Sequence, residues 1–143
     1  MVRKTDDPNF PPPARATSGS AGLDLMACMT DDVTIMPGDR FTFHTGWAFA
    51  IPSGYEGQVR PRSGLAVKHG VTLVNAPGTI DSDYRGEVTA TLINLGGRPY
   101  TVKPRDRICQ MIIARTESWE AEVVEAFTDE TERGEKGHGS TGY

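Results

Sequence analysis

Short segments in which apolar and polar residues alternate recur along most of the chain. Because the side chains of a strand point to its two faces in turn, such alternation predicts half-buried strands. The predicted strands cover residues 32–36, 40–45, 47–51, 56–60, 71–74, 86–94, 100–103, 107–114 and 119–125. The single predicted helix covers residues 63–68, with Ser63 suited to cap its N-terminus and Gly70 to end it. Many short strands and one helix predict an all-β fold.

The spacing of the turns narrows the fold class. Residues 35–40 and 102–107 share the order apolar, any, Pro, any, Asp, Arg, and each segment leads into a predicted strand. Two such corners suggest paired hairpins, as in a distorted jelly roll or double-sheet β-sandwich. The composition agrees, since Val, Ile and Thr far outnumber Leu, and 16 Gly and 10 Pro supply turns. A helical bundle is excluded, and 143 residues suit a single domain over 1–143.

Both ends of this domain differ in composition from its middle. Residues 1–17 form a lead-in that we expect to be extended, because it contains three consecutive prolines at 11–13. Residues 128–143 are charged and then glycine-rich, without apolar periodicity, and alone they should be disordered.

Charge and cysteine usage limit the classes of function. A formal net charge of −4 and a pI near 5.3 argue against broad binding to nucleic acid. The apolar runs fall far short of the ~18 residues of a membrane span, and the first residues do not resemble a signal peptide, so we expect a cytoplasmic protein. Cys28 and Cys109 lie in apolar runs, where reduced, packed thiols are expected. An anionic substrate would have to be attracted by local groups.

Residues 61–66 contain the first such groups. A strand leads to Arg62, Ser63 and Gly64 at the first turn of the short helix. Unpaired backbone N–H groups, a guanidinium and a hydroxyl there predict an anion site. The alternative is a surface arginine beside an ordinary helix cap.

A second candidate segment covers residues 74–87. Its turn at Asn75 predicts a tight hairpin whose backbone donors and acceptors could pair with a small planar base. Asp81 follows Thr79 and Ile80, which are taken as an apolar pair, and is therefore a candidate for a partly buried carboxylate that takes a proton from water. The alternative is an Asp-rich turn that stays in solvent.

The C-terminal residues 133–142 form the third segment. They combine Arg, Ser and Thr with four glycines, a string that can wrap a phosphate if something else orders it. Otherwise this segment is a flexible terminus.

Taken together, these segments resemble the trimeric dUTP nucleotidohydrolase (dUTPase) family. Five motifs match in order, from about Ser18 to the C-terminus: residues 21–25, 61–70, 74–87, 105–111 and 133–142. The resemblance implies a jelly-roll-like subunit in a homotrimer, with the C-terminal arm of one chain exchanged to close an active site formed by others. It implies hydrolysis of dUTP to dUMP and pyrophosphate with Mg²⁺ as cofactor, and no nucleic-acid or membrane partner.

The resemblance also implies roles for individual residues. Asp81 would be the general base for the water that attacks the α-phosphorus, and Asp24 would help to position the site through waters of the metal. Tyr84 would pack under the deoxyribose and exclude a 2′-hydroxyl. The remaining substrate contacts would be the phosphate-binding Arg62, Ser63, Gly64 and Gln110, the uracil-binding Asn75, Thr79 and Ile80, and the arm residues Arg133, His138, Gly139, Ser140 and Thr141.

Two arm residues depart from the usual family pattern. Lys136 stands where a glycine is common, and His138 stands where a phenylalanine is common. His138 could still stack on uracil as a planar ring, and that stacking should weaken when the imidazole becomes protonated.

Two alternative functions are open. A dCTP deaminase would share the fold and would need a glutamate that acts on the cytosine amino group, for which residues 86–88 offer Glu87. A non-catalytic binding or regulatory protein would keep only the nucleotide pocket.

Overall fold

Ten strands and one helix make up the fold. The computed structural model describes residues 1–135 and residue 137. The helix is α1 (Ser63–His69). The strands are β1 (Val2–Arg3), β2 (Leu23–Met26), β3 (Val33–Ile35), β4 (Arg40–Ala48), β5 (Tyr55–Pro61), β6 (Val71–Leu73), β7 (Gly78–Ile80), β8 (Glu87–Asn94), β9 (Tyr100–Val102) and β10 (Arg107–Arg115). The predicted all-β class with one short helix is confirmed.

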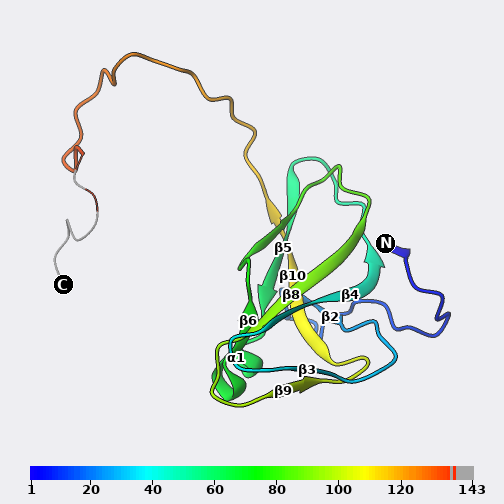
Figure 1. Cartoon of the computed structure of the whole chain (residues 1–143). Coiled ribbons are helices and arrows are strands. Elements are labelled where there is room, and N and C mark those ends of the chain that lie inside the picture. The colour runs from blue at the N-terminus through cyan, green and yellow to red at the C-terminus, as the bar shows by residue number, and fades with distance from the viewer. Residues whose placement is uncertain (136, 138–143) are drawn as a thin grey trace.

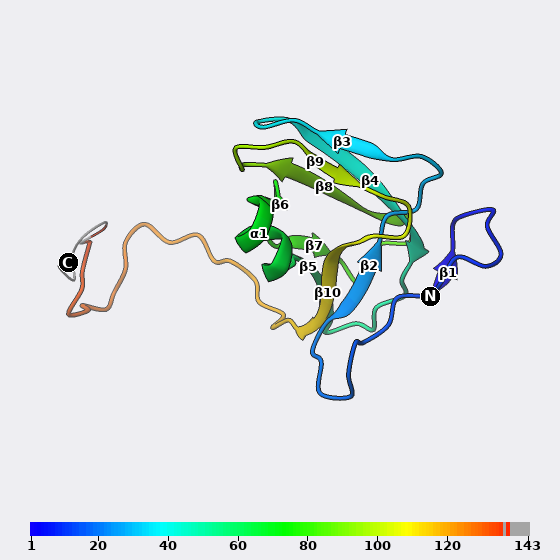
Figure 2. The ribbon, with the colours of Figure 1, turned by 90° about the horizontal axis from the view of Figure 1, so that it is seen from below.

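Two four-stranded antiparallel sheets form the body of the molecule. One has the order β1-β4-β8-β6 and the other the order β2-β10-β5-β7, while β3 and β9 form a separate pair. Figure 2 shows the sheet of β4 and β8 stacked over the sheet of β5 and β10. This arrangement is the double-sheet sandwich that the turn pattern predicts.

The core lies between these two sheets. Along β8, alternate residues from Val88 to Asn94 are buried, as the period-two pattern requires. Phe43 and Leu92 from one sheet and Met111 from the other are almost fully buried members of one apolar cluster.

The start of the helix differs from the prediction. Arg62, with extended backbone angles (φ −96°, ψ 127°), is the N-cap residue, and no side chain caps the helix. Ser63 is instead the first helical residue, because the carbonyl of Arg62 accepts the N–H groups of Leu65 and Ala66 at 3.1 Å. The helix ends as predicted at Gly70, whose φ of 69° suits a glycine.

The predicted separate strand at residues 47–51 is wrong. Strand β4 continues through Trp47 to Ala48, and a register shift between His44 and Ala48 in its pairing with β8 marks a bulge. Gly46, within this bulge, has a φ of +73°, a conformation that glycine adopts easily. The bulge bends the chain here, so that one strand covers the region where two strands were predicted. Phe49 and Ile51 follow as buried residues outside the strand.

The predicted strand at residues 119–125 is also wrong. Within the described residues the chain has no strand after β10, and it leads away from the two sheets (Figure 1). Trp119 and Val123 are 78% and 96% exposed. A strand needs a neighbour for its backbone N–H and C=O groups, and no described part of the chain lies beside this segment as a partner strand.

Three strands were not predicted, namely β1, β2 and β7. Of these, β2 and β7 are flanked by motif residues, and each pairs at the edge of the sheet that contains β5 and β10. In the described part of the chain, no helix is long and apolar enough to cross a membrane.

Candidate active site

A pocket of about 320 Å³ opens where β2, β10 and the start of α1 meet. Strand pairing explains this meeting, because Gln110 of β10 lies opposite Asp24 of β2 on one side and Arg60 of β5 on the other. Strand β5 then delivers Arg62 directly to the helix. The pocket is lined by Ala16, Ser20, Ala21, Gly22, Asp24, Arg62, Ser63, Gly64, Arg107 and Gln110. Three motifs that are far apart in sequence are thus brought together.

An ion cluster lies in this pocket. Asp24 places Oδ1 3.2 Å from Nε of Arg62 and Oδ2 3.2 Å from Nη1 of Arg107. The Nη1 group of Arg62 also donates a 2.9 Å hydrogen bond to the backbone carbonyl of Arg107. Two guanidinium groups around one carboxylate leave the cluster positively charged, which suits an anionic ligand on an acidic protein.

Gln110 is fixed at the same pocket. Its Nε2 donates to the carbonyl of Pro61 at 3.1 Å. A Cβ on Gly22 would lie 2.6 Å from Oε1 of Gln110, so glycine at this position leaves room for the amide. Ser63 and Gly64, by contrast, are exposed at the mouth of the pocket on the first turn of the helix.

The hairpin that ends in β7 lies apart from the pocket. Gly78, Thr79 and Ile80 pair with Val59, Gln58 and Gly57 of β5, and Asp81 follows directly. Asn75 and Thr79 are exposed, and Asp81 is exposed rather than partly buried as predicted. Strand β7 is the edge strand of its sheet, so no further strand of that sheet lies beside it to cover this carboxylate.

Strand geometry separates Asp81 from Arg62. Ile80 of β7 lies opposite Gly57 of β5, and because the two strands are antiparallel, Asp81 lies beside Glu56. Glu56 comes six residues before Arg62, and the backbone between them is extended. At about 3.3 Å per residue the separation is about 20 Å. A triphosphate is much shorter than this separation.

Tyr84 lies in the loop between β7 and β8. The residue is 43% exposed, and its hydroxyl donates to the carbonyl of Glu87 at 3.0 Å. A Cβ on Gly86 would overlap the hydroxyl oxygen of Tyr84, so this position of the ring requires glycine at 86.

The carboxylate of Glu87 is engaged by β4. One oxygen accepts the N–H of Gly46 at 2.7 Å, and the other lies 2.8 Å from Nδ1 of His44. Both oxygens therefore serve the bulge in β4 rather than the hairpin or the pocket.

The thiol behind the pocket is unreactive. Cys109 precedes Gln110 on β10 but points into the core, where it is completely buried. Burial raises the pKa of this thiol to about 12, with the nearby charge of Asp24 acting in the same direction. Both cysteines are free, as predicted.

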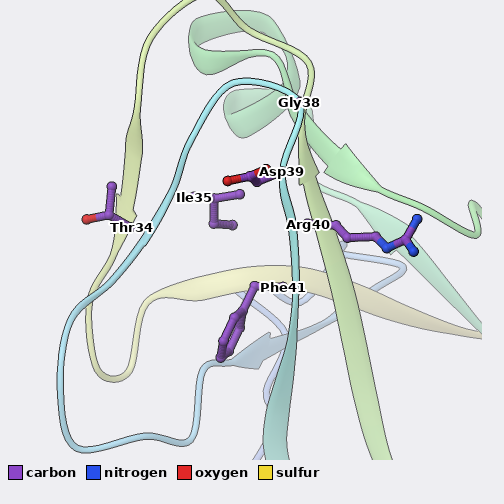
Figure 3. A pocket seen from close by; sticks show the side chains of 6 residues that line it. All are labelled: Thr34, Ile35, Gly38, Asp39, Arg40 and Phe41. Carbon is purple, nitrogen blue, oxygen red and sulfur yellow. The ribbon is translucent and has the colours of Figure 1, made fainter.

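A separate hollow of about 410 Å³ lies between β3 and the start of β4 (Figure 3). Arg40 and Phe41 point to different sides of the strand there. The predicted site residues do not contribute to its lining, which consists of Thr34, Ile35, Gly38, Asp39, Arg40 and Phe41.

The arm is only partly within the described residues. Arg133 is exposed. The predictions for Lys136, His138, Gly139, Ser140 and Thr141 lie outside the described residues.

Sequence reasoning missed Arg107 and Gly22 as pocket residues. Both lie inside motifs that it recognised, but only the pairing of β2 with β10 shows that Arg107 reaches Asp24. In the described part of the chain, no group of three or more His, Cys, Asp or Glu side chains is placed to hold a metal ion.

Comparison with known proteins agrees with this geometry. A family model described as dUTPase matches residues 9–142. The deoxyuridine 5′-triphosphate nucleotidohydrolase of Ehrlichia canis is 52% identical over 99% of this chain and 93% of its own, and that of Caulobacter vibrioides is 56% identical over 94% and 87%. A solved structure of the Staphylococcus bacteriophage 80alpha dUTPase with dUPNHPP is 26% identical, has a TM-score of 0.83 and covers 99% of this chain and 96% of its own. The chain belongs to the dUTPase family.

Proposed function

We propose that the chain is a dUTP diphosphatase, which hydrolyses dUTP to dUMP and pyrophosphate. The observation that carries this proposal is the pocket in which Asp24, Arg62 and Gln110 meet from three separate segments. Relatives at 52% and 56% identity that carry this activity in their names support it. In the cell, the reaction would lower dUTP and supply dUMP for dTMP synthesis, and we place the enzyme in the cytoplasm.

The pocket is proposed to hold the triphosphate. The positively charged cluster around Arg62 supplies charge-assisted hydrogen bonds, and Ser63, Gly64 and Gln110 add polar groups at the same opening. Such fixed donors stabilise the charge that develops as the bond to pyrophosphate breaks.

The pocket also fits Mg²⁺ bound chiefly by the substrate. It offers one carboxylate, Asp24, rather than a cage of acidic side chains. Mg²⁺ keeps much of its water shell and is commonly held by one or two carboxylates together with substrate phosphates. When bound, the ion would neutralise charge on the phosphates, and Asp24 would orient its waters.

Asp81 is proposed to be the general base, supplied to the pocket by another copy of the chain. Its separation of about 20 Å from Arg62 along the strand supports this division of the site between subunits. Its carboxylate would accept a proton from the water that attacks the α-phosphorus. A homotrimer with three such shared sites follows from the family pattern.

The same hairpin is proposed to select the base and the sugar. The backbone near Asn75, Thr79 and Ile80 would pair with uracil and leave no room for the methyl group of thymine. The ring of Tyr84 would lie under the deoxyribose and exclude a 2′-hydroxyl, and its hydrogen bond to Glu87 holds it in place.

The C-terminal residues 128–143 are proposed to act as an arm that crosses to another subunit. The exposed apolar side chains of Trp119, Val123 and Phe127 before it support docking on a second copy. The arm would then close over the nucleotide with Arg133, His138, Gly139, Ser140 and Thr141.

Pyrophosphate release from dUTP in the presence of Mg²⁺ tests the activity, and Asp81→Asn tests the base. We expect the variant to bind a non-hydrolysable dUTP analogue with an affinity close to wild type while turnover falls at least 10²-fold. Turnover near the wild-type rate would show that the base is another residue. Light scattering should give the mass of three chains.

The two alternative functions are separated by simple assays. A deaminase would release ammonia from dCTP, but both carboxylate oxygens of Glu87 are held by β4, which disfavours that role. A binding protein without catalysis would bind dUTP and Mg²⁺ but release no pyrophosphate.

A further inference from the structure

Arg107 lines the phosphate pocket but has no role among the motif residues discussed above. Arg107 lies at the start of β10, opposite Met26 of β2. Met26 comes two residues after Asp24 on the same strand. The side chain of Arg107 is 49% exposed, whereas that of Asp24 is only 17% exposed. Arg107 therefore reaches from the rim of the pocket to a carboxylate near its floor.

Arg107 is connected to Arg62 in two ways, indirectly through the carboxylate of Asp24 and directly through its backbone carbonyl. Through its side chain, Arg107 holds Oδ2 of Asp24, and the other oxygen of the same carboxylate holds Nε of Arg62, each at 3.2 Å. Through its backbone carbonyl, Arg107 accepts the Nη1 group of Arg62 at 2.9 Å. The guanidinium plane of Arg62 is thus fixed at two nitrogens, and the rotamer of Asp24 is fixed at two oxygens.

We propose that Arg107 is a positioning residue of the dUTP site, which orients Asp24 and, through Asp24, the phosphate-binding face of Arg62. Without Arg107 the carboxylate would have a single cationic partner and would draw Arg62 toward itself, in competition with the triphosphate. With Arg107 present, the carboxylate is shared and the pocket keeps a net positive charge. The inference rests on the proposed assignment of this pocket to the phosphates.

A positioning role for Arg107 predicts a change in KM with little change in kcat. Arg107 acts through groups that bind the phosphates and takes no proton in the reaction, so its loss should weaken binding more than the chemical step. Charge-assisted hydrogen bonds of this kind correspond to about 10- to 100-fold in affinity. For Arg107→Gln we expect KM to rise at least tenfold and kcat to stay within about threefold.

A double-mutant cycle tests whether the effect passes through Asp24. In an Asp24→Asn background, Arg107→Gln should raise KM by less than about threefold, because the carboxylate that it positions is already gone. Calorimetric binding of a non-hydrolysable imido analogue of dUTP, with and without Mg²⁺, provides a readout independent of turnover. Arg107→Lys keeps the charge and should recover part of the affinity that Arg107→Gln loses.

The matched control is Arg105→Gln. Arg105 also pairs with a carboxylate, that of Asp7 at 2.8 Å, but it does not line the pocket. We expect its KM and analogue affinity to remain within twofold of wild type. Equal losses in the two variants, or purely additive effects in the Asp24→Asn background, would overturn the proposal.

Arg62→Gln separates this inference from the proposed function. If Arg62→Gln weakens analogue binding and Arg107→Gln does not, only the role of Arg107 is wrong. If neither variant changes binding, the phosphate site itself has been misassigned. Should Arg107→Gln not fold, Arg107→Lys alone decides: a wild-type KM would overturn the proposal, and a severalfold rise would support it.

Discussion

The buried thiol of Cys109, next to Gln110 of the pocket, makes the free energy of unfolding depend on pH. Because the folded protein raises the pKa of this thiol to about 12, from the ordinary 9.0, folding favours the neutral form. The stability associated with the neutral thiol is fully present below pH 9 and is lost as the pH rises toward 12. The free energy of unfolding of the protein should therefore decrease at alkaline pH.

Replacing Cys109 should flatten this alkaline loss. Between pH 9 and 11, the free energy of unfolding of the wild type should fall by up to roughly 1 kcal/mol per pH unit more than that of Cys109→Ala. Denaturant unfolding at a series of pH values measures the difference. Cys28→Ala, which replaces the other free cysteine, is the control and should follow the wild type. Parallel curves for Cys109→Ala and wild type would contradict the prediction.

Protonation of the His138 imidazole should make the KM for dUTP depend on pH. If the neutral ring stacks on uracil, protonation near pH ~6.5 should weaken substrate binding. The KM for dUTP should therefore rise on acidification from pH 8 to about 5.5 in the wild type and rise less in His138→Phe. Matching profiles of KM against pH in the two proteins would refute stacking by the imidazole.

At the scale of elements, the loop between β7 and β8 depends on one glycine. The position of Gly86 against the ring of Tyr84 leaves no space for a Cβ. The contacted atom is the tip of a side chain, so an alanine would displace the ring rather than unfold the hairpin. The strands on either side of the loop, β7 and β8, pair with β5 and β4 and would keep their register.

Gly86→Ala should therefore change sugar selectivity with little change in stability. We expect the preference for dUTP over UTP, as the ratio of kcat/KM values, to fall about tenfold, while the melting temperature shifts by only a few degrees. Gly97→Ala is the matched control, because a Cβ at Gly97 meets open space. An unchanged preference for dUTP in Gly86→Ala would show that the position of the Tyr84 ring does not determine sugar selectivity.

Elements that depend on local pattern were predictable, and those that depend on long-range pairing were not. The alternation along β8 and the stop at Gly70 are local, and both predictions are confirmed. At the β4 bulge, a Cβ on Gly46 would meet Cys28 and Phe10, which are distant in sequence, so no local pattern shows how close the chain comes there. The segment 119–125 has the alternation of a strand, but the residues that the structure describes offer it no partner strand.

The same distinction holds for the site. The motifs indicated Asp24, Arg62 and Gln110 individually, and their meeting in one pocket depends on the strand order β2-β10-β5. Arg107 was missed because its contact with Asp24 spans two strands. Asp81 was expected to be partly buried because Ile80 precedes it, yet that apolar neighbour lies at the sheet edge and leaves the carboxylate exposed.

At the scale of the whole molecule, a site divided between subunits predicts complementation. Asp81→Asn and Gln110→Ala chains should each be inactive alone, since each lacks one half of every site. After mixing in denaturant and refolding at equal amounts, about a quarter of the sites should combine an intact pocket with an intact hairpin. Pyrophosphate release from the refolded mixture measures this recovery.

The control for complementation is the same mixture without unfolding. If subunits do not exchange, it should stay inactive. No recovery after refolding, with light scattering showing mixed assemblies, would mean that each chain forms its site alone.

The segment after β10 also affects how this chain behaves before it meets a partner. A newly made chain exposes Trp119, Val123 and Phe127 to water, and such residues in an extended segment favour aggregation. Glu120, Glu122 and Glu125 lie between them, and their mutual repulsion opposes stacking of like segments. If the segment docks on a second copy as proposed, these acidic residues would limit its aggregation before docking.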